Sequence, residues 1–213
     1  MATGTEEYAR PAQPPDTSSW TEVRDAARKC TACHLYKRAT QTVFGEGVVP
    51  SRLMLVGETP GEHEDRAGRP FVGPAGRLLD ESIAAAGLDR GTIYVTNAVK
   101  HFRWEERGKR RLHKKPSWGQ VEACRPWLLG EIEIVAPKLI VCLGATAAQS
   151  LLGAEFRITK SRGKIHKREA MPAVLATYHP SADLRAPMPA DRARMKAELI
   201  HDLKAARQYL STR

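Results

Sequence analysis

Short apolar runs alternate with helical patterns along most of the chain. Four of these runs have the length and composition of strands that are covered on both faces of a parallel sheet, and they occupy residues 53–56, 92–95, 139–143 and 174–177. Amphipathic periodicity and end signals predict helices over residues 74–86, 117–134, 145–152 and 191–210. This order predicts an α/β fold, namely a three-layer α/β/α sandwich around a central, mainly parallel four-stranded sheet.

The first 18 residues differ in composition from the rest of the chain. They are polar and rich in proline, with too few apolar groups to offset the entropy lost on ordering. Ser19 and Glu22 then have the spacing of a helix capping box, which predicts a helix that ends near Cys30. We therefore expect a disordered tail at residues 1–18 and a single domain over residues 19–213.

Positive charge is concentrated in one segment. The formal net charge is +10, and residues 100–115 contain eight lysine or arginine residues against two glutamates, a net charge of +6. Such a segment is suited to neutralising phosphates, although most basic runs are only solvated loops. No run of apolar residues is long enough to cross a membrane, and the N-terminus does not resemble a secretory signal. We expect a cytoplasmic monomer that does not bind membranes.

Polar residues follow three of the predicted strands at the point where each strand ends. The first strand runs into Gly57 and Glu58, the second into Asn97 and the fourth into His179. Carboxyl ends of parallel strands share one edge of the sheet, and ligands bind at that edge. Each residue alone could simply end a strand, but a carboxylate, an amide and an imidazole at one edge together predict a functional site.

The chain has four cysteines, and each has more than one possible role. Cys30 and Cys33 have a spacing that is typical of metal sites and also of redox dithiols. Cys124 falls in a predicted helix and Cys142 in a predicted strand, where either could be a small buried hydrophobic residue. Four thiolates fit a structural zinc ion or a cubane iron–sulfur cluster, and the spacing alone does not decide between them.

Several motifs in a fixed order resemble the uracil-DNA glycosylase superfamily. They are Gly-Glu-Thr-Pro-Gly at residues 57–61, Phe-Val-Gly-Pro-Ala-Gly-Arg-Leu-Leu-Asp at 71–80, Thr-Asn-Ala-Val-Lys-His-Phe at 96–102 and His-Pro-Ser at 179–181. The cysteine pattern is similar to that of the iron–sulfur branches, family 4 and the DNA-cross-linking X branch. The basic segment Gly-Lys-Arg-Arg-Leu-His-Lys at 108–114 resembles an inserted loop of the X branch. The resemblance extends from about residue 30 to residue 185.

The resemblance implies a role for each candidate residue. It places a structural [4Fe-4S] cluster, with zinc as the alternative, on Cys30, Cys33, Cys124 and Cys142. It assigns uracil binding to Gly57, Phe71, Asn97 and His179, and catalysis to Glu58, His113 and His179. We assign contacts with uracil-containing DNA, single- or double-stranded, to Lys109, Arg110, Arg111, Lys114 and Ser181.

The chemistry of these residue types suits removal of uracil. An asparagine amide offers a donor and an acceptor that can match O4 and N3–H of uracil, and a histidine can donate to O2 as the base leaves as an anion. Nearby positive charge is expected to lower the pKa of His113, and a neutral imidazole can add to C1′ of the sugar. Three positions depart from the X-branch pattern: Thr59 replaces glutamine, Leu112 replaces isoleucine and Ala182 replaces a second serine.

Three functions are therefore compared. The first is a uracil-DNA glycosylase that flips and excises uracil and is then captured covalently at C1′ through His113. The second is a hydrolytic, multi-turnover glycosylase of the family 4 type, in which His113 only contacts DNA. The third is a non-catalytic DNA-binding module with a structural four-cysteine metal site.

Overall fold

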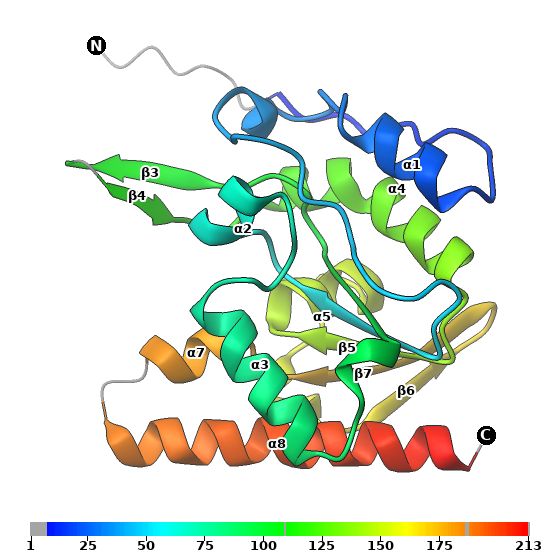
Figure 1. The fold of residues 1–213 in the computed structure, drawn as a ribbon, viewed down its shortest axis with the longest axis vertical. Coiled ribbons are helices and arrows are strands. Elements are labelled where there is room, and N and C mark those ends of the chain that lie inside the picture. Colours follow the sequence, from blue (N-terminus) through cyan, green and yellow to red (C-terminus); the bar gives the residue numbers. More distant parts are fainter. Residues whose placement is uncertain (1–7, 109, 186–187, 213) are drawn as a thin grey trace.

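Five strands form the central sheet of the protein. The computed structural model describes residues 8–108, 110–185 and 188–212, so Lys109 lies outside the described residues. The strand order is β2-β1-β5-β7-β6 (Figure 1). The bounds are Leu53–Gly57 for β1, Ile93–Asn97 for β2, Leu139–Leu143 for β5, Ile165–Arg168 for β6 and Met171–Thr177 for β7.

The four strands predicted from the apolar runs are confirmed, and they pair in parallel. The sheet has one strand more than the four that were predicted, because β6 pairs antiparallel with β7 at the edge. Its sequence, Ile-His-Lys-Arg, contains no run of apolar residues, since only part of an edge strand is buried. A prediction based on buried runs therefore misses β6.

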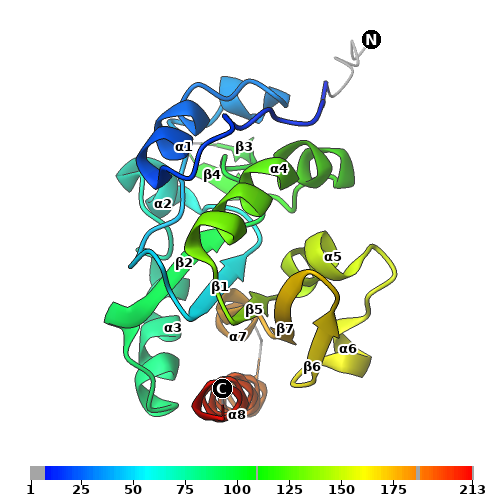
Figure 2. The same ribbon diagram turned by 90° about the vertical axis from the view of Figure 1, so that its right-hand side faces the viewer.

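Helices cover both faces of the sheet, which confirms the three-layer sandwich. Figure 2 shows α3 and α8 on one side and α4 and α5 on the other. Leu79 of α3 and Leu203 of α8 pack in the core on the first face, and Leu128 of α4 and Ala147 of α5 pack on the second. The bounds are Trp20–Ala27 for α1, Glu62–Ala67 for α2, Pro74–Ala85 for α3, Trp118–Val135 for α4, Ala145–Leu152 for α5, Ile158–Ser161 for α6, Pro180–Arg185 for α7 and Pro189–Ser211 for α8.

Capping side chains begin two of the helices. The Ser19 hydroxyl accepts a hydrogen bond from the main-chain N–H of Glu22 and starts α1, as its spacing predicts. Ser117 and Gln120 form a reciprocal capping box at the start of α4. Helix α1 ends at Ala27 rather than near Cys30, and the chain then turns before Cys33.

The segment before α1 packs on the domain from residue 8 onward. The N–H of Arg10 donates to the carbonyl of Ala32, and the N–H of Ala12 donates to the carbonyl of Ala123, each at 2.8 Å. Ala12 is buried. Residues 8–18 thus differ from the disordered tail that their composition suggested, because main-chain hydrogen bonds hold them where apolar side chains are few. Residues 1–7 lie outside the described residues.

A two-stranded hairpin projects from the main body of the domain (Figure 1). It comprises β3 (Trp104–Arg107) and β4 (Arg110–His113), and Trp104 pairs with His113 across it. The Trp104 indole N–H donates to the carbonyl of Arg38 at 3.0 Å, and the Arg38 guanidinium lies 4.2 Å from the Trp104 ring centroid. The basic segment predicted from the sequence is therefore an ordered hairpin whose base is fastened to the domain.

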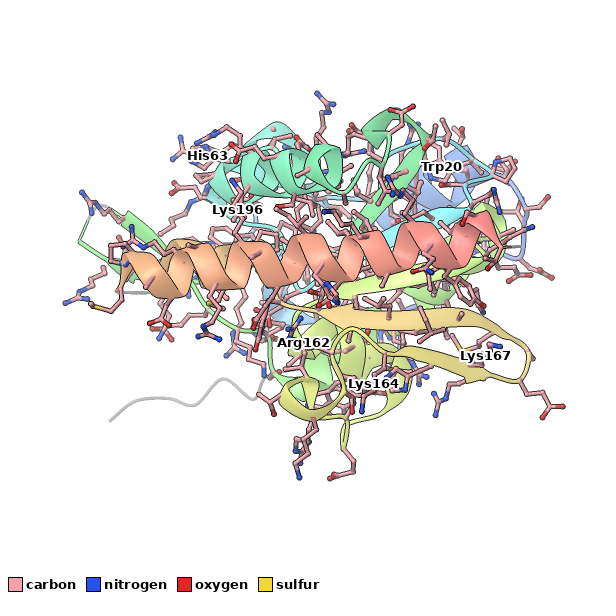
Figure 3. The ribbon with its side chains drawn as sticks, turned by 90° about the horizontal axis from the view of Figure 1, so that it is seen from below. Trp20, His63, Arg162, Lys164, Lys167 and Lys196 are labelled. Atoms are coloured by element: carbon pink, nitrogen blue, oxygen red, sulfur yellow. The ribbon has the colours of Figure 1, made fainter. Side chains whose placement is uncertain are left out.

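Helix α8 is tied to the end of β7. Figure 3 shows α8 lying along the β6–β7 ribbon, with Arg162 near the place where the ribbon approaches the helix. Asp202 of α8 accepts hydrogen bonds from Arg162 at 2.7 Å and from the Thr177 hydroxyl at 2.6 Å. These bonds fix the last residue of β7, two residues before His179. None of the helices in the described part of the chain is long and apolar enough to span a membrane.

Candidate active site

A pocket of about 520 Å³ opens at the carboxyl edge of the sheet. It is lined by Ser181 of α7 and by five other residues selected from the sequence, namely Glu58, Phe71, Asn97, His113 and His179. These five come from the ends of β1, β2 and β7, from the hairpin and from the turn before α3. The structure thus brings together the carboxylate, the amide and the two imidazoles, as the strand-end rule predicts for the first, second and fourth strands.

The absence of a side chain at Gly57 lets two pocket residues approach. A Cβ at this position would lie 2.3 Å from Asn97 Oδ1 and 2.7 Å from Phe71 Cζ. Phe71 has a φ of +56°, and the Cβ of any residue replacing Gly76 would lie 1.7 Å from the Phe71 carbonyl oxygen. The Phe71 ring is stacked against His179 with centroids 6.2 Å apart. These contacts give the pocket a flat aromatic wall beside the Asn97 amide.

The carboxylate of Glu58 is held by a residue that the sequence did not single out. It accepts a hydrogen bond from the hydroxyl of Thr146, in the first turn of α5. Thr59, which stands where the X-branch pattern has glutamine, is buried and donates to the carbonyl of His101 at 2.8 Å, so it does not contact the Glu58 carboxylate through this hydroxyl. A negative charge at this helix N-terminus is also favoured by the helix dipole. The sequence predicts the helix that begins here, over residues 145–152, but gives no sign that Thr146 in its first turn contacts Glu58.

His179 has a defined tautomer when its ring is neutral. The main-chain N–H of Ser181 donates to His179 Nδ1 at 3.0 Å, and the Ser181 hydroxyl lies 2.8 Å from the same nitrogen. Because Nδ1 accepts a hydrogen bond from the main chain, the ring proton resides on Nε2. His179 can therefore present an N–H donor to a ligand. Ser181, which we expected to contact DNA, orients this imidazole.

The two faces of β4 have different environments. Side chains alternate along a strand, so Arg111 and His113 share one face while Arg110 and Leu112 share the other. His113 lies against the Phe102 ring, with centroids 6.1 Å apart, and lines the pocket. Arg110 and Leu112 are exposed. His113 is also exposed, but it stands at the pocket, whereas Arg110 and Leu112 do not line it.

Arg111 contacts the protein where we expected it to contact phosphate. Its guanidinium donates to Asp65 Oδ2 at 2.7 Å and lies over the rings of Phe102 and Trp104, at 5.4 and 5.5 Å from their centroids. Asp65 is fully buried and also accepts from the N–H and hydroxyl of Thr40, at 2.9 and 2.6 Å. Arg111 thus fastens the hairpin to α2. Lys114 follows β4 at the base of the hairpin, where its exposed ammonium pairs with Glu105.

Three of the four cysteines lie together. Cys30, Cys33 and Cys124 belong to one core cluster, in which the Trp127 indole donates to Cys30 Sγ at 3.1 Å. Burial raises the pKa of Cys124 to about 12; Lys100 lowers this pKa, and the neighbouring Cys33 and Cys30 raise it. No group of three or more histidine, cysteine or acidic side chains in the described residues is arranged to hold a single metal ion. The assigned ligand set is therefore not confirmed.

Cys142 lies apart from the other three cysteines. It is a central residue of β5, paired with Val56 on one side and Ala176 on the other, and it is completely buried in a different core cluster. Burial alone raises its pKa. The sequence alternative that Cys142 is a small buried hydrophobic residue fits this position, and its assignment as a metal ligand stays a prediction.

A family model described as the uracil DNA glycosylase superfamily matches residues 44–204. The chain belongs to the uracil-DNA glycosylase superfamily. A Type-4 uracil-DNA glycosylase of Thermotoga maritima is 41% identical over 164 residues, which cover 76% of this chain and 82% of that protein. A Type-4 enzyme of Sulfurisphaera tokodaii is 36% identical over 199 residues, covering 90% of this chain and 84% of that protein.

A more distant relative in the same superfamily is the Type-5 uracil-DNA glycosylase of Pyrobaculum aerophilum. It is 31% identical over 153 residues, which cover 63% of each protein. The resemblance to the uracil-DNA glycosylase superfamily is thus confirmed, and the relatives named Type-4 are more similar to this chain than the Type-5 relative is. The assignment of this chain to the cross-linking X branch stays a prediction.

Proposed function

We propose that this protein removes uracil from DNA by cleaving the N-glycosidic bond. The observation that carries this proposal is the pocket at one edge of the sheet that Glu58, Asn97 and His179 line together. Neighbours form hydrogen bonds with the side chains of Glu58 and His179 and with the main-chain carbonyl of Asn97. The names of the Type-4 relatives support it. The target nucleotide has to leave the base stack to reach this pocket, either by flipping or from a single strand.

Each residue of the pocket then has one task in the reaction. The Phe71 ring stacks on the base, and the Asn97 amide pairs with its O4 and N3–H, a pattern that cytosine reverses. As the bond between C1′ and N1 breaks, its electron pair goes to uracil, and the Nε2–H of His179 donates to the negative O2. Glu58 stabilises the positive charge that develops on the sugar.

The group that attacks C1′ defines two forms of this function. In the first, which the Type-4 relatives favour, a water molecule oriented by Glu58 attacks and gives an abasic site, and the enzyme turns over. This hydrolytic form is the one we propose as the main function. DNA contacts come from Arg110, Lys114 and Lys115, since Arg110 and Lys114 are exposed on the hairpin and Lys115 lines the pocket mouth.

One observation favours a second form, in which His113 takes the place of water. His113 lines the pocket and lies on a hairpin that Arg111 fastens to the domain. A ring nitrogen would form a bond to C1′ while uracil leaves with the bonding electrons, and the remaining ring proton would pass to Glu58 or to water. The product is a neutral alkylated imidazole, which leaves poorly, so the protein would stay attached to the DNA.

A single gel experiment tests the proposal and separates its two forms. The protein is incubated with a labelled uracil-containing oligonucleotide, boiled in SDS and run on a denaturing gel, beside His113→Ala and a thymine oligonucleotide. Alkaline cleavage at the uracil without a shifted band supports hydrolysis. A uracil-dependent band at the summed mass that His113→Ala loses supports capture. If neither signal forms, the protein is a DNA-binding module, and excision is not its function.

We also propose that Cys30, Cys33 and Cys124 hold an iron–sulfur cluster. The three thiols converge where the N-terminal segment, the 3₁₀ turn His34–Lys37 and α4 meet, so the cluster would act as a structural cross-link. We keep Cys142 as the fourth ligand that the resemblance implies, and the measurement below decides whether this central residue of β5 belongs to the set.

Iron content and visible absorbance test this ligand set directly. The purified wild-type protein should be brown and absorb near roughly 400 nm. Cys124→Ser should lose the iron and the colour. Cys142→Ser should lose them as well if Cys142 is the fourth ligand, and retention of both would exclude it, while a colourless protein that contains zinc would overturn the cluster itself.

A further inference from the structure

A buried ion pair lies directly behind the Asn97 end of β2. Lys100 is 1% exposed and Glu131, from the middle of α4, is fully buried. The Lys100 ammonium contacts Glu131 and donates to the Thr96 hydroxyl and to the main-chain carbonyl of Asn97, each at 2.7 Å. An ammonium group has three protons, so these contacts use all of them.

The carboxylate of Glu131 is as fully engaged as the ammonium. It accepts from the Gly45 N–H at 2.9 Å, the Tyr94 hydroxyl at 2.9 Å and the Thr96 hydroxyl at 3.0 Å. Burial, followed by the charge of Glu131, raises the pKa of Tyr94, so this hydroxyl stays protonated and donates. Every member of the network therefore has one defined arrangement.

Stability alone does not account for this ion pair. Removing two charges from water costs several kcal/mol per ion, and well-packed apolar residues in place of such a pair are often as stable or more so. The pair also occupies the inner layer of the sandwich, where the neighbouring Leu128 and Ile132 are apolar. A polar network at this position is thus better explained by what it holds in place.

The network holds the main chain that carries the pocket amide. Lys100 fixes the carbonyl of Asn97 from the side of the core, while the N–H of Ala98 donates to Gly57 at 2.9 Å and the N–H of Val99 donates to Glu58 at 3.0 Å. The two peptide groups that follow Asn97 are therefore fixed. With the backbone fixed and Gly57 leaving space, the side chain of Asn97 is directed across the end of β1.

We propose that Lys100, held by Glu131, is the positioning residue that aims the Asn97 amide at the uracil base. Neither side chain reaches the pocket, so neither is a catalytic residue. Their effect is on recognition: loss of the pair leaves the DNA-binding surface intact but weakens the match between Asn97 and uracil. This inference rests on the proposed function, because it concerns recognition of the base in the same pocket.

The double variant Lys100→Met/Glu131→Gln tests the inference. Methionine is unbranched and only one atom shorter than lysine, and the glutamine oxygen can still accept from Gly45 and Tyr94, so both charges go while most of the packing is kept. The affinity for free uracil is measured by product inhibition or calorimetry, and the affinity for a uracil-free oligonucleotide is measured separately. We expect uracil to bind about tenfold more weakly, the effect of one lost hydrogen bond, and the oligonucleotide to bind within about twofold of wild type.

A matched control separates positioning from a general loss of stability. Val135→Ala removes two methyl groups from the same helix, in the core and away from Asn97, and should lower the melting temperature without changing uracil affinity. If the double variant does not fold, Glu131→Gln alone is measured, with a smaller loss expected in the same direction. Isotope labelling of asparagine would also show an altered Asn97 amide signal in the ligand-free variant.

The possible outcomes distinguish this inference from the proposed function. If the wild type binds and excises uracil and the folded variant binds uracil as tightly, the pair is only structural and the inference is wrong. A parallel loss of uracil affinity in Val135→Ala would have the same meaning. If the wild type neither binds nor excises uracil, it is the proposed function that fails.

Discussion

The two walls of the pocket are built in different ways. One wall consists of strand ends, where every residue of β1 and β2 is buried and Asn97 is held through its carbonyl by the side chain of Lys100. The other wall is the β3–β4 hairpin, whose residues are mostly exposed and whose inward face is fastened mainly by Arg111. In the proposed function, recognition of the base therefore depends on the buried strand ends, while the exposed hairpin lies beside the sugar. We expect mutations in the strand ends and mutations in the hairpin to have different effects on uracil affinity and on attack at the sugar.

The largest expected effect is on the excision rate, from a substitution of His179 at the wall of strand ends. In His179→Ala the leaving uracil loses a preorganised donor, and removal of one such donor lowers kcat by about 10²–10³-fold in comparable sites. Single-turnover excision at saturating enzyme measures this. His201→Ala, on the exposed part of α8, is the control and should keep the wild-type rate. An unchanged rate in His179→Ala would exclude the imidazole from the departure of the base.

Gly57→Ala should have the next largest effect. The added methyl group would lie 2.3 Å from Asn97 Oδ1 and 2.7 Å from Phe71 Cζ, so the amide or the ring has to move. We expect uracil affinity to fall by about tenfold or more and the free energy of unfolding by about 1–3 kcal/mol, as for other overpacked sites. Gly130→Ala is the matched control, because its new methyl group meets no atom within 4 Å. It should leave uracil affinity unchanged.

The wall of strand ends could be predicted because the carboxyl ends of parallel strands share one edge of the sheet. Buried parallel strands are apolar along their whole length, so the positions of Glu58 and Asn97 follow from where the apolar runs stop. The same rule gives no information about what lies behind the edge. Lys100 is almost completely buried, yet in the sequence it is one more cation of a basic segment, because its partner Glu131 is 31 residues away.

The hairpin and the cysteines show where prediction from the sequence is insufficient. Arg110 and Arg111 are adjacent and identical in type, and only the pairing register of β4 decides that Arg111 turns inward to Asp65. Similarly, Cys142 fits a four-cysteine count, although its strand places it between Val56 and Ala176 in the centre of the sheet. Charge and spacing predict the composition of a site, whereas the facing direction of a side chain depends on tertiary pairing.

Arg111→Met should loosen the β3–β4 hairpin without changing the affinity for uracil. The substitution leaves the buried Asp65 without its ion-pair partner, which costs about 3–5 kcal/mol at fully buried sites and less at this half-buried arginine. We expect faster hydrogen exchange over residues 104–113, a sugar-attack step slowed by about tenfold and uracil affinity within about twofold of wild type. Arg110→Met should leave hydrogen exchange in the hairpin unchanged.

If uracil affinity falls together with the attack rate in Arg111→Met, the two walls are coupled, and base recognition does not depend on the strand ends alone. Hydrogen exchange that stays at the wild-type level would instead show that Trp104 and Arg38 are sufficient to fasten the hairpin. Either result would also bear on capture through His113, since that reaction needs the histidine near C1′.

The smallest effect is expected from the outward face of the hairpin. Arg110→Gln and Lys114→Gln each remove an exposed charge, so each should lower the slope of log Kd against log salt by about one if the wild-type side chain neutralises one phosphate. Excision at saturating DNA should not change, because neither side chain lies in the pocket lining. Lys167→Gln, at the far end of the β6–β7 ribbon in Figure 3, is the matched control for removal of a charge. An equal change in slope for Lys167→Gln would mean that DNA responds to the net charge of the protein, and the hairpin would then be a support for His113 rather than a DNA-binding surface.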